Sequence, residues 1–195
     1  MTCRLRRLLA GAALMGLHAL AAAALPGKAH PVAPGVYAVI GEAALGSPAN
    51  RNFISNAGFI VTDGGVVVID ALGSPALANE LVAQIRQVTP QPIRYVIATH
   101  YHADHIYGLQ VFKAQGATII ANAGGREYLN SDTARLRLEA SRTELAPWID
   151  AKTQLVPADR WLGDEQSTLQ VGNQKLRLLH VGPAHTPEDL AIYVE

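Results

Sequence analysis

The sequence contains almost no cysteine. Its single thiol, Cys3, lies in an N-terminal segment that we predict is removed on export. The remaining chain therefore has no residue for a disulfide bond, a thiolate metal ligand or a cysteine nucleophile. If this protein binds a metal ion, imidazole and carboxylate groups must supply the ligands.

Charge is also scarce, and it is balanced. Charged residues make up 16% of the 195 residues, with 16 basic and 16 acidic side chains, so the formal net charge is zero. This composition provides no basic surface for nucleic acid or anionic lipid, and we predict neither as a partner. Hydrophobic residues make up 49% of the chain, which is enough for one globular domain with a sizeable core.

The N-terminal segment has the layout of a secretory signal peptide. A stretch with three arginines precedes an apolar run from Leu8 to Leu25, which ends in small residues. A membrane anchor is the alternative, because the run approaches spanning length. Its alanine content favours cleavage, near Ala24 or near Ala29. We therefore assign residues 1–29 to the signal peptide and the start of a linker. We predict a periplasmic protein, with secretion as the alternative, that has no stable membrane insertion after cleavage.

The middle of the chain alternates strand and helix patterns. An apolar hairpin is expected from Phe53 to Ile69, because a β-branched run follows the turn Asp63-Gly64-Gly65. Ser74 and Pro75 then begin a helix as N-cap and first helical residue, and the helix stops before Pro90. The remaining expected elements are strands at 36–40, 93–98 and 118–121 and a helix at 106–114. This order implies parallel strand pairing and an α/β layer architecture.

The other parts of the chain have less regular patterns. Residues 26–34 are rich in proline, glycine and alanine and are interpreted as a linker. Residues 125–152 carry mixed charge at helical spacing and predict one or two solvated helices. Strands at 168–171 and 175–179 flank a Gly-Asn turn, and another strand follows at 190–194. No helix pattern follows that last strand, so we expect the sequence to be a fragment of a longer domain.

Three of the seven histidines lie in one short segment, His100-Tyr101-His102-Ala103-Asp104-His105. Side chains alternate sides in an extended segment, so His100 and His102 point the same way and can share a metal ion. Asp104 and His105 follow as the chain turns into a helix, and they aim at a neighbouring point. Imidazole and carboxylate ligands without thiolate suit zinc, iron or manganese, and zinc is the usual ion for three histidines.

Two further residues are candidates for the same site. The cluster follows an apolar strand, and open α/β sheets bind ligands beyond such strand ends. Asp70 ends the neighbouring predicted strand, where it either orients a histidine from behind or serves only as a turn residue. His185 lies in the loop Gly182-Pro183-Ala184-His185-Thr186-Pro187, after another predicted strand. A lone histidine in such a loop is usually just exposed, so these residues alone leave its role open.

These motifs resemble those of the metallo-β-lactamase fold superfamily of hydrolases. The His-x-His-x-Asp-His cluster and the later Gly-x-x-His-Thr-Pro loop are similar to two of its main motifs. The hairpin from Asn56 to Asp70 is similar to its opening, so the resemblance covers residues 36–195. It implies an αββα sandwich, present here as an incomplete domain over residues 30–195. In layout the chain resembles most the exported quinoprotein-associated zinc metallohydrolases.

The resemblance also implies roles for the candidate residues. His100, His102 and His185 would bind a first zinc ion, and Asp104 and His105 would bind a second. Asp104 would also act in catalysis by orienting a zinc-activated water. The substrate would be a small molecule with an ester, thioester or amide (lactam) bond.

Residues beyond the given sequence decide the second metal site. The superfamily's bridging aspartate and final histidine have no counterpart before Glu195, so two zinc ions are expected only if the full-length fold is present. Two alternatives to a zinc hydrolase are an iron enzyme that resembles mononuclear persulfide dioxygenases, and a non-catalytic metal-binding half-fold. The sequence indicates neither the oligomeric state nor the identity of the substrate.

The remaining histidines and aromatic residues are assigned mainly to packing. Tyr101 and Tyr107 are expected in the core, with donation to an oxyanion as the alternative for Tyr107. His180 is interpreted as structural, and Asp189 as hydrogen-bonded within its own loop rather than as a ligand. Three aromatic residues either line an apolar substrate cleft or only pack: Tyr128, Trp148 and Trp161.

Overall fold

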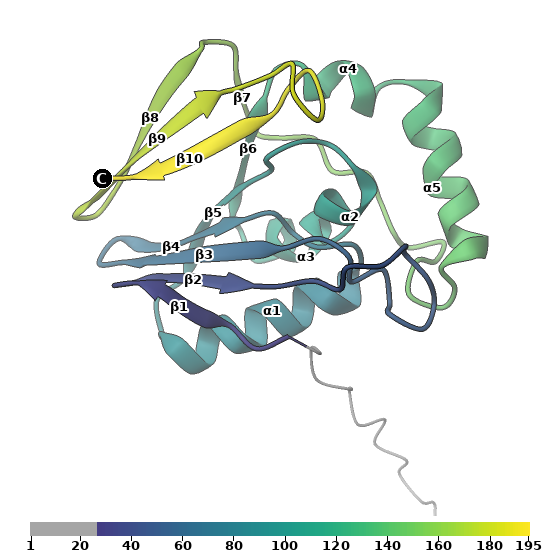
Figure 1. Cartoon of the computed structure of the whole chain (residues 1–195), viewed down its shortest axis with the longest axis horizontal. Helices are drawn as coiled ribbons and strands as arrows, with labels where there is room; N and C mark the ends of the chain where they lie inside the picture. Colours follow the sequence, from purple (N-terminus) through teal and green to yellow (C-terminus); the bar gives the residue numbers. More distant parts are fainter. Residues whose placement is uncertain (1–26) are drawn as a thin grey trace, which may run out of the picture.

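The computed structural model describes residues 27–195, which form two β-sheets and a set of helices (Figure 1). The predicted signal peptide lies outside the described residues, apart from positions 27–29. No helix of the described part of the chain is long and apolar enough to cross a membrane.

The larger sheet has seven strands that lie side by side in chain order. They are β1 (His30–Ala33), β2 (Val36–Val39), β3 (Ala57–Thr62), β4 (Gly65–Ile69), β5 (Ile93–Ile97), β6 (Thr118–Asn122) and β7 (Arg160–Leu162). Strands β1 to β4 pair antiparallel, whereas β4 to β7 pair parallel. The parallel half confirms the pairing expected from the alternation of strands and helices. The carboxyl ends of these strands therefore meet at one edge of the sheet, where β5 leads toward His100.

Strand β4 is covered on both faces. Val66, Val67 and Val68 are fully buried. Val66 and Val68 belong to the core beneath the helices, whereas Val67 belongs to the core between the two sheets. A continuous β-branched run suits a strand that is buried on both sides.

Five helices accompany the sheets in residues 27–195. They are α1 (Pro75–Val88), α2 (Ala103–Ile106), α3 (Leu109–Ala114), α4 (Gly125–Leu129) and α5 (Asp132–Glu144). α1 begins as expected, because Ser74 Oγ accepts a hydrogen bond from the Leu77 amide at 3.4 Å. α1 and α3 cover one face of the larger sheet, while α4 and α5 lie beyond its carboxyl-end edge (Figure 1).

The expected single helix over 106–114 is wrong, because α2 and α3 are separate helices with a break at Gly108. A Cβ atom on Gly108 would lie 2.0 Å from the carbonyl oxygen of Ala71. The Ala71 amide in turn donates to the carbonyl oxygen of His105 at 2.8 Å. The segment after β4 thus lies directly against this break, and only glycine permits that approach.

The smaller sheet contains β8 (Gln166–Val171), β9 (Gln174–His180) and β10 (Leu190–Val194), with β9 in the middle. The expected hairpin is confirmed, and Gly172 has a φ of +56° at the turn. Leu176 and Leu178 of β9 belong to the apolar core between the sheets, together with Ile97 and Ile120 of the larger sheet.

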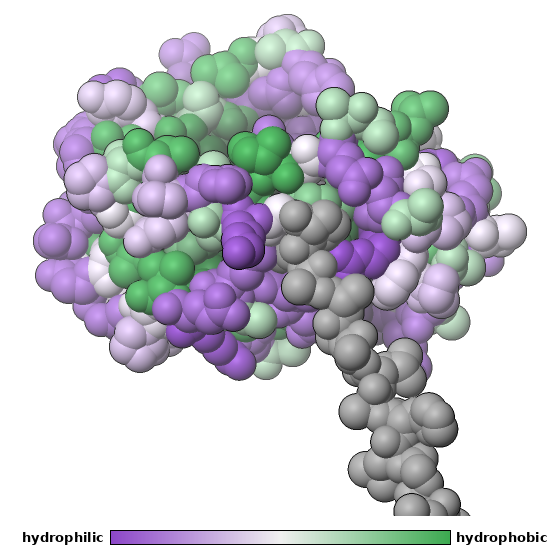
Figure 2. Space-filling view, turned by 60° about the horizontal axis from the view of Figure 1, so that its bottom comes forward, coloured by the Kyte–Doolittle hydropathy of each residue, from purple (hydrophilic) through white to green (hydrophobic). Residues whose placement is uncertain are grey.

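The layers therefore run from helices through the larger sheet to the smaller sheet. No helix covers the outer face of the smaller sheet within residues 27–195, so this part of the chain contains three layers of the αββα arrangement (Figure 1). On the face of the molecule seen in Figure 2, hydrophobic residues gather in several places with hydrophilic residues between them.

Two expectations for the N-terminal half are wrong in detail. Residues 30–33, interpreted as linker, form β1, which pairs with β2 at the edge of the sheet. All four are exposed, so they show none of the alternation that identifies a half-buried strand. The strand expected to start at Phe53 starts only at Ala57, and Phe53 is a buried loop residue.

Candidate metal centre

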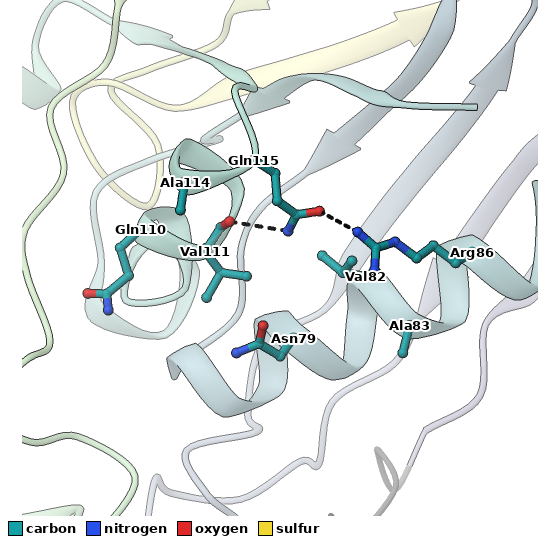
Figure 3. A pocket seen from close by; sticks show the side chains of 8 residues that line it. All are labelled: Asn79, Val82, Ala83, Arg86, Gln110, Val111, Ala114 and Gln115. Atoms are coloured by element: carbon teal, nitrogen blue, oxygen red, sulfur yellow. Dashed lines mark hydrogen bonds between the residues drawn. The ribbon is translucent and has the colours of Figure 1, made fainter. Parts of the chain in front are cut away.

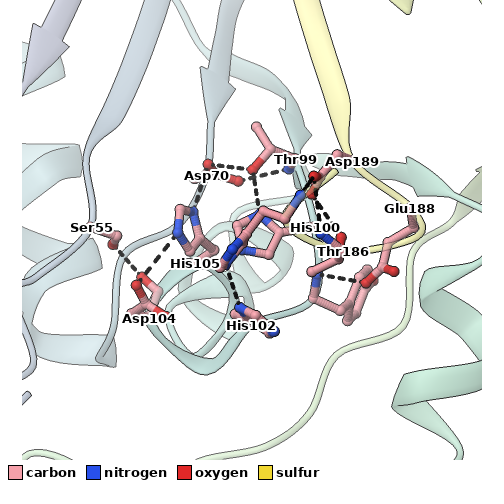
Figure 4. Close-up of polar contacts among 12 residues, drawn as sticks. Ser55, Asp70, Thr99, His100, His102, Asp104, His105, Thr186, Glu188 and Asp189 are labelled. Atoms are coloured by element: carbon pink, nitrogen blue, oxygen red, sulfur yellow. Dashed lines mark hydrogen bonds and ion pairs between the residues drawn. The ribbon is translucent and has the colours of Figure 1, made fainter. Parts of the chain in front are cut away.

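The predicted site residues come together at the carboxyl-end edge of the larger sheet (Figure 4). They are Asp70 after β4, His100 and His102 after β5, Asp104 and His105 in α2, and His185 in the loop between β9 and β10. Segments that follow strands of both sheets thus contribute residues to the same site.

Three imidazoles face one another at this edge. One ligand atom from each of His100, His102 and His185 lies within 4.8 Å of the others. His185 Nε2 is 3.0 Å from His102 Nδ1, although 83 residues separate them. His100 Nε2 is buried and has no hydrogen-bond partner among residues 27–195. Buried polar atoms normally have a partner, so this nitrogen and its two neighbours fit a bound metal ion.

Burial keeps two of these imidazoles neutral. It lowers the pKa of His100 to about 4, with the nearby His105 adding to the effect. Burial and then the charge of His185 also lower the pKa of His102. A metal ion binds the lone pair of a neutral imidazole, so both residues are in the form that ligation requires at neutral pH.

Asp70 orients the imidazole of His105 through a hydrogen bond. Its Oδ2 atom lies 2.8 Å from His105 Nδ1. Because an ionised carboxylate only accepts hydrogen bonds, Nδ1 carries a proton, and in the neutral imidazole Nε2 then holds the lone pair. Burial opposes the charging of His105, but the hydrogen bond and charge of Asp70 outweigh it and raise the pKa of His105. The sequence left two roles open for Asp70, and the structure shows the first of them, the orientation of a histidine.

Thr99 joins two parts of this network, and no sequence pattern identified it beyond its place before His100. Its amide and hydroxyl groups each donate to the Asp70 carboxylate at 2.8 Å. Its hydroxyl oxygen also lies 3.0 Å from His100 Nδ1. Thr99 therefore connects the residue behind His105 with the imidazole of His100.

Asp104 lies beside His105 at the start of α2. Asp104 Oδ2 is 3.4 Å from His105 Nε2. The Ser55 hydroxyl donates to the backbone oxygen of Asp104, which ties α2 to the loop before β3. The His105 ring in turn lies beside that of His100, with ring centroids 4.2 Å apart, so Asp104 and His105 are close to the three imidazoles.

Asp189 shapes the loop that carries His185. Its carboxylate accepts hydrogen bonds from the His185 amide at 2.6 Å and from the Thr186 amide and hydroxyl at 3.0 and 2.7 Å. Burial alone would raise the pKa of Asp189, but the hydrogen bonds from Thr186 and His185 lower it. The expectation that Asp189 bonds within its own loop is confirmed.

The aromatic residues near the site mostly pack. Tyr101 is buried and stacks on Trp161 with ring centroids 5.6 Å apart, and the buried Tyr107 hydroxyl lies 3.3 Å from Ser141 Oγ. The Trp148 indole donates to the backbone of Pro48 at 2.8 Å. Tyr128 alone of the three cleft candidates lines a cavity next to His102.

Two cavities open beside His102. The first has a volume of about 600 Å³ and is lined by Leu45, Gly46, Asn52, Ile54, His102, Ala103, Asp104, Tyr128, Thr133 and Arg137. The second has a volume of about 380 Å³ and is lined by His102, Gly124, Glu127, Tyr128, Ser131, Thr133, Thr186, Pro187 and Glu188. Nothing in the sequence pattern identified Arg137 or Glu188, because both come close to His102 only through the tertiary fold.

A separate groove lies between α1 and α3, away from the histidines (Figure 3). Arg86 donates to the Gln115 side-chain oxygen at 3.1 Å, and Gln115 donates to the backbone oxygen of Val111 at 3.2 Å. None of the residues that line this groove is a histidine or a carboxylate, so it offers no metal-binding chemistry.

Comparisons with known proteins agree with this geometry. A family model described as the metallo-beta-lactamase superfamily matches residues 50–195. A metallo-beta-lactamase type 2 of Bacillus cereus is 25% identical over 142 residues, which cover 72% of this chain and 46% of that protein. A linear primary-alkylsulfatase of a Pseudomonas species is 23% identical, over 67% of this chain and 29% of that protein. The chain thus spans less than half the length of these relatives.

Solved structures show the same fold at lower identity. The FEZ-1 metallo-beta-lactamase of Legionella gormanii superposes with a TM-score of 0.64 at 17% identity, over 88% of this chain and 59% of that chain. A sec-alkylsulfatase of a Pseudomonas species superposes with a TM-score of 0.63 at 20% identity, over 86% of this chain and 29% of that chain. At such identities the likeness concerns the fold alone.

Proposed function

We propose that this chain, which belongs to the metallo-beta-lactamase superfamily, is a zinc-dependent hydrolase whose first metal ion is held by His100, His102 and His185. One observation carries the proposal: ligand atoms of these three imidazoles lie within 4.8 Å of one another. The partnerless Nε2 atom of His100 supports the same assignment.

Asp104 and His105 are proposed as ligands of a second zinc ion. Asp70 accepts a hydrogen bond from Nδ1–H of His105, so Nε2 is the nitrogen able to bind a metal, and Asp104 Oδ2 lies 3.4 Å from that atom. Both residues lie on α2, which begins directly after His102.

The chemistry proposed is hydrolysis by an activated water molecule. Bound zinc supplies Lewis acidity, which makes water a nucleophile near neutral pH and polarises the bond under attack. Asp104 accepts a hydrogen bond from the attacking water and so orients it. The two cavities beside His102 hold the substrate on either side of the scissile bond. A small ester, thioester or lactam fits this chemistry, and the similarity to an alkylsulfatase adds sulfate esters to the candidates.

Metal analysis and a substrate panel test the proposal. The purified chain is expected to contain zinc and to hydrolyse at least one lactam, thioester, ester or sulfate ester, with loss of activity on chelation. His185→Ala is expected to lose zinc and activity, whereas His30→Ala, on the exposed strand β1, retains both. Bound iron with oxygen consumption would support the persulfide dioxygenase alternative. Full zinc occupancy without turnover of any substrate would support the non-catalytic half-fold.

Export to the periplasm is proposed from the basic and apolar pattern at the N-terminus. Cell fractionation with N-terminal sequencing tests it. We expect a periplasmic product that starts after Ala24 or after Ala29. An uncleaved cytoplasmic product would contradict the assignment.

A further inference from the structure

We propose that the larger cavity beside His102 binds an anionic group of the substrate and that Arg137 is the residue that recognises it. The inference rests on the proposed hydrolase function and narrows its substrates to esters, thioesters or amides that carry a second, negatively charged group.

The cavity connects the metal centre with α5. Ala103 and Asp104 of α2 line it together with His102, and Thr133 and Arg137 of α5 line it as well. A substrate whose scissile bond lies at the histidines therefore extends toward α5. The cavity has a volume of about 600 Å³, which is enough for a small organic molecule.

Arg137 has hydrogen-bonding capacity to spare. Its side chain is 47% exposed, and its Nη1 atom pairs with Glu144 Oε2 at 2.9 Å. A guanidinium has five N–H donors in a planar fork, so one such contact leaves several for a carboxylate or sulfonate. Tyr128 lines the same cavity, and its hydroxyl has no hydrogen-bond partner among residues 27–195, so it can supply a further donor.

The second cavity is lined by two carboxylates and by no lysine or arginine, which favours one direction of binding. Glu127 and Glu188 line it, and Glu188 is buried, with its Oε1 atom 3.4 Å from the Tyr101 amide. These two carboxylates repel an anion from the second cavity, whereas Arg137 attracts it into the first. The two cavities share His102, Tyr128 and Thr133, so a substrate that spans both is oriented by this difference in charge.

Part of the cavity wall is apolar and suits an apolar part of the substrate. Leu45 and Ile54 of the loop between β2 and β3 line the cavity, and Leu45 is 89% exposed. Two hydrogen bonds hold this loop, because Trp148 donates to the Pro48 oxygen at 2.8 Å and Ser55 donates to the Asp104 oxygen. The class of ligand that fits is a short apolar chain with a carboxylate or sulfonate at the end remote from the scissile bond.

Arg137→Gln and Arg135→Gln form a matched pair for the test. Both remove one positive charge from α5, but Arg135 pairs with Asp132 and does not line the cavity. The substrates are 4-nitrophenyl hydrogen glutarate and its neutral methyl ester. In the zinc-loaded chain we expect Arg137→Gln to reduce the kcat/KM ratio of the anionic over the neutral substrate by about tenfold. Arg135→Gln is expected to leave the ratio unchanged. Equal ratios in both variants would overturn the inference.

A binding measurement separates this inference from the proposed hydrolysis. Phenylacetate and neutral phenylacetamide are titrated into the zinc-loaded variants and followed by NMR. We expect only Arg137→Gln to lose the preference for phenylacetate, and Glu144→Gln to strengthen it by releasing Nη1. If the variants show these binding preferences but neither 4-nitrophenyl ester is hydrolysed, the hydrolase proposal fails and the anion site stands. If Arg137→Gln and Arg135→Gln bind phenylacetate equally well, binding depends on the metal alone and the proposal of an anion site at Arg137 fails.

Discussion

His105 Nδ1 lies 2.8 Å from Oδ2 of Asp70, although 35 residues separate the two in the chain. The contact links the end of β4 with α2 across the carboxyl-end edge of the larger sheet. Because Asp70 also receives two hydrogen bonds from Thr99, one carboxylate holds three groups of the site. Its loss should therefore affect metal binding more than folding.

Asp70→Asn tests this role. Asp70 has a φ of +62°, a backbone conformation that asparagine tolerates as well as aspartate, so the substitution removes the charge without new strain. The amide no longer fixes the proton on Nδ1 of His105. We expect zinc affinity to fall about 10- to 100-fold in a competition titration, as it does when partners of metal ligands are lost. Unchanged affinity together with a large loss of thermal stability would show that Asp70 is only structural.

Asp189→Asn is expected to loosen the loop that presents His185. The carboxylate accepts bonds from the His185 and Thr186 amides and from the Thr186 hydroxyl, and an amide oxygen cannot replace both carboxylate oxygens. We predict about a tenfold loss of zinc affinity, measured by the same titration. The control is Asp164→Asn, at an exposed position before β8, which should bind zinc like the parent protein.

Gly108→Ala should destabilise the fold. The added methyl group would lie 2.0 Å from the Ala71 carbonyl oxygen and 2.6 Å from the Ala78 Cβ atom, so the backbone must shift. We expect a loss of about 1–3 kcal/mol in the free energy of unfolding, measured with urea. Gly163→Ala is the matched control, because no atom lies within 4 Å of a Cβ at that position. Equal stability of the two variants would contradict the close approach of Ala71 to Gly108.

Asp159 gives the protein a pH-dependent contribution to stability. Burial alone would raise its pKa, but hydrogen bonds from the Lys113 side chain and the Ile119 amide lower it. A carboxyl group with a depressed folded-state pKa stabilises the fold above its unfolded pKa, near 4, and the contribution disappears as pH falls through the folded value. Asp159→Asn is therefore expected to lower unfolding stability at pH 7, and this difference should shrink below about pH 4. A difference that stays constant over this range would show that the charge of Asp159 contributes nothing.

Regular elements with a local pattern were predictable. The β-branched run Val66–Ile69 identified a buried strand, and the pair Ser74-Pro75 identified the start of α1. Elements without such a pattern were missed. β1 is exposed at every position, and β7 has only three residues, too few to show a period. The break at Gly108 escaped prediction because the partner that requires it, Ala71, is distant in the sequence.

The sequence by itself determined the identity and spacing of the candidate metal ligands from His100 to His105, because alternation along a strand and the turn into a helix are local properties. It also identified His185 as a candidate through its loop motif. Only the tertiary structure decided that His185 lies 3.0 Å from His102 and that Asp70 orients His105. It also decided that Arg137 lines one cavity beside His102 and Glu188 the other. These relationships join residues far apart in the chain, and the pairing of strands and the packing of the two sheets bring them together. No short-range pattern encodes such distances.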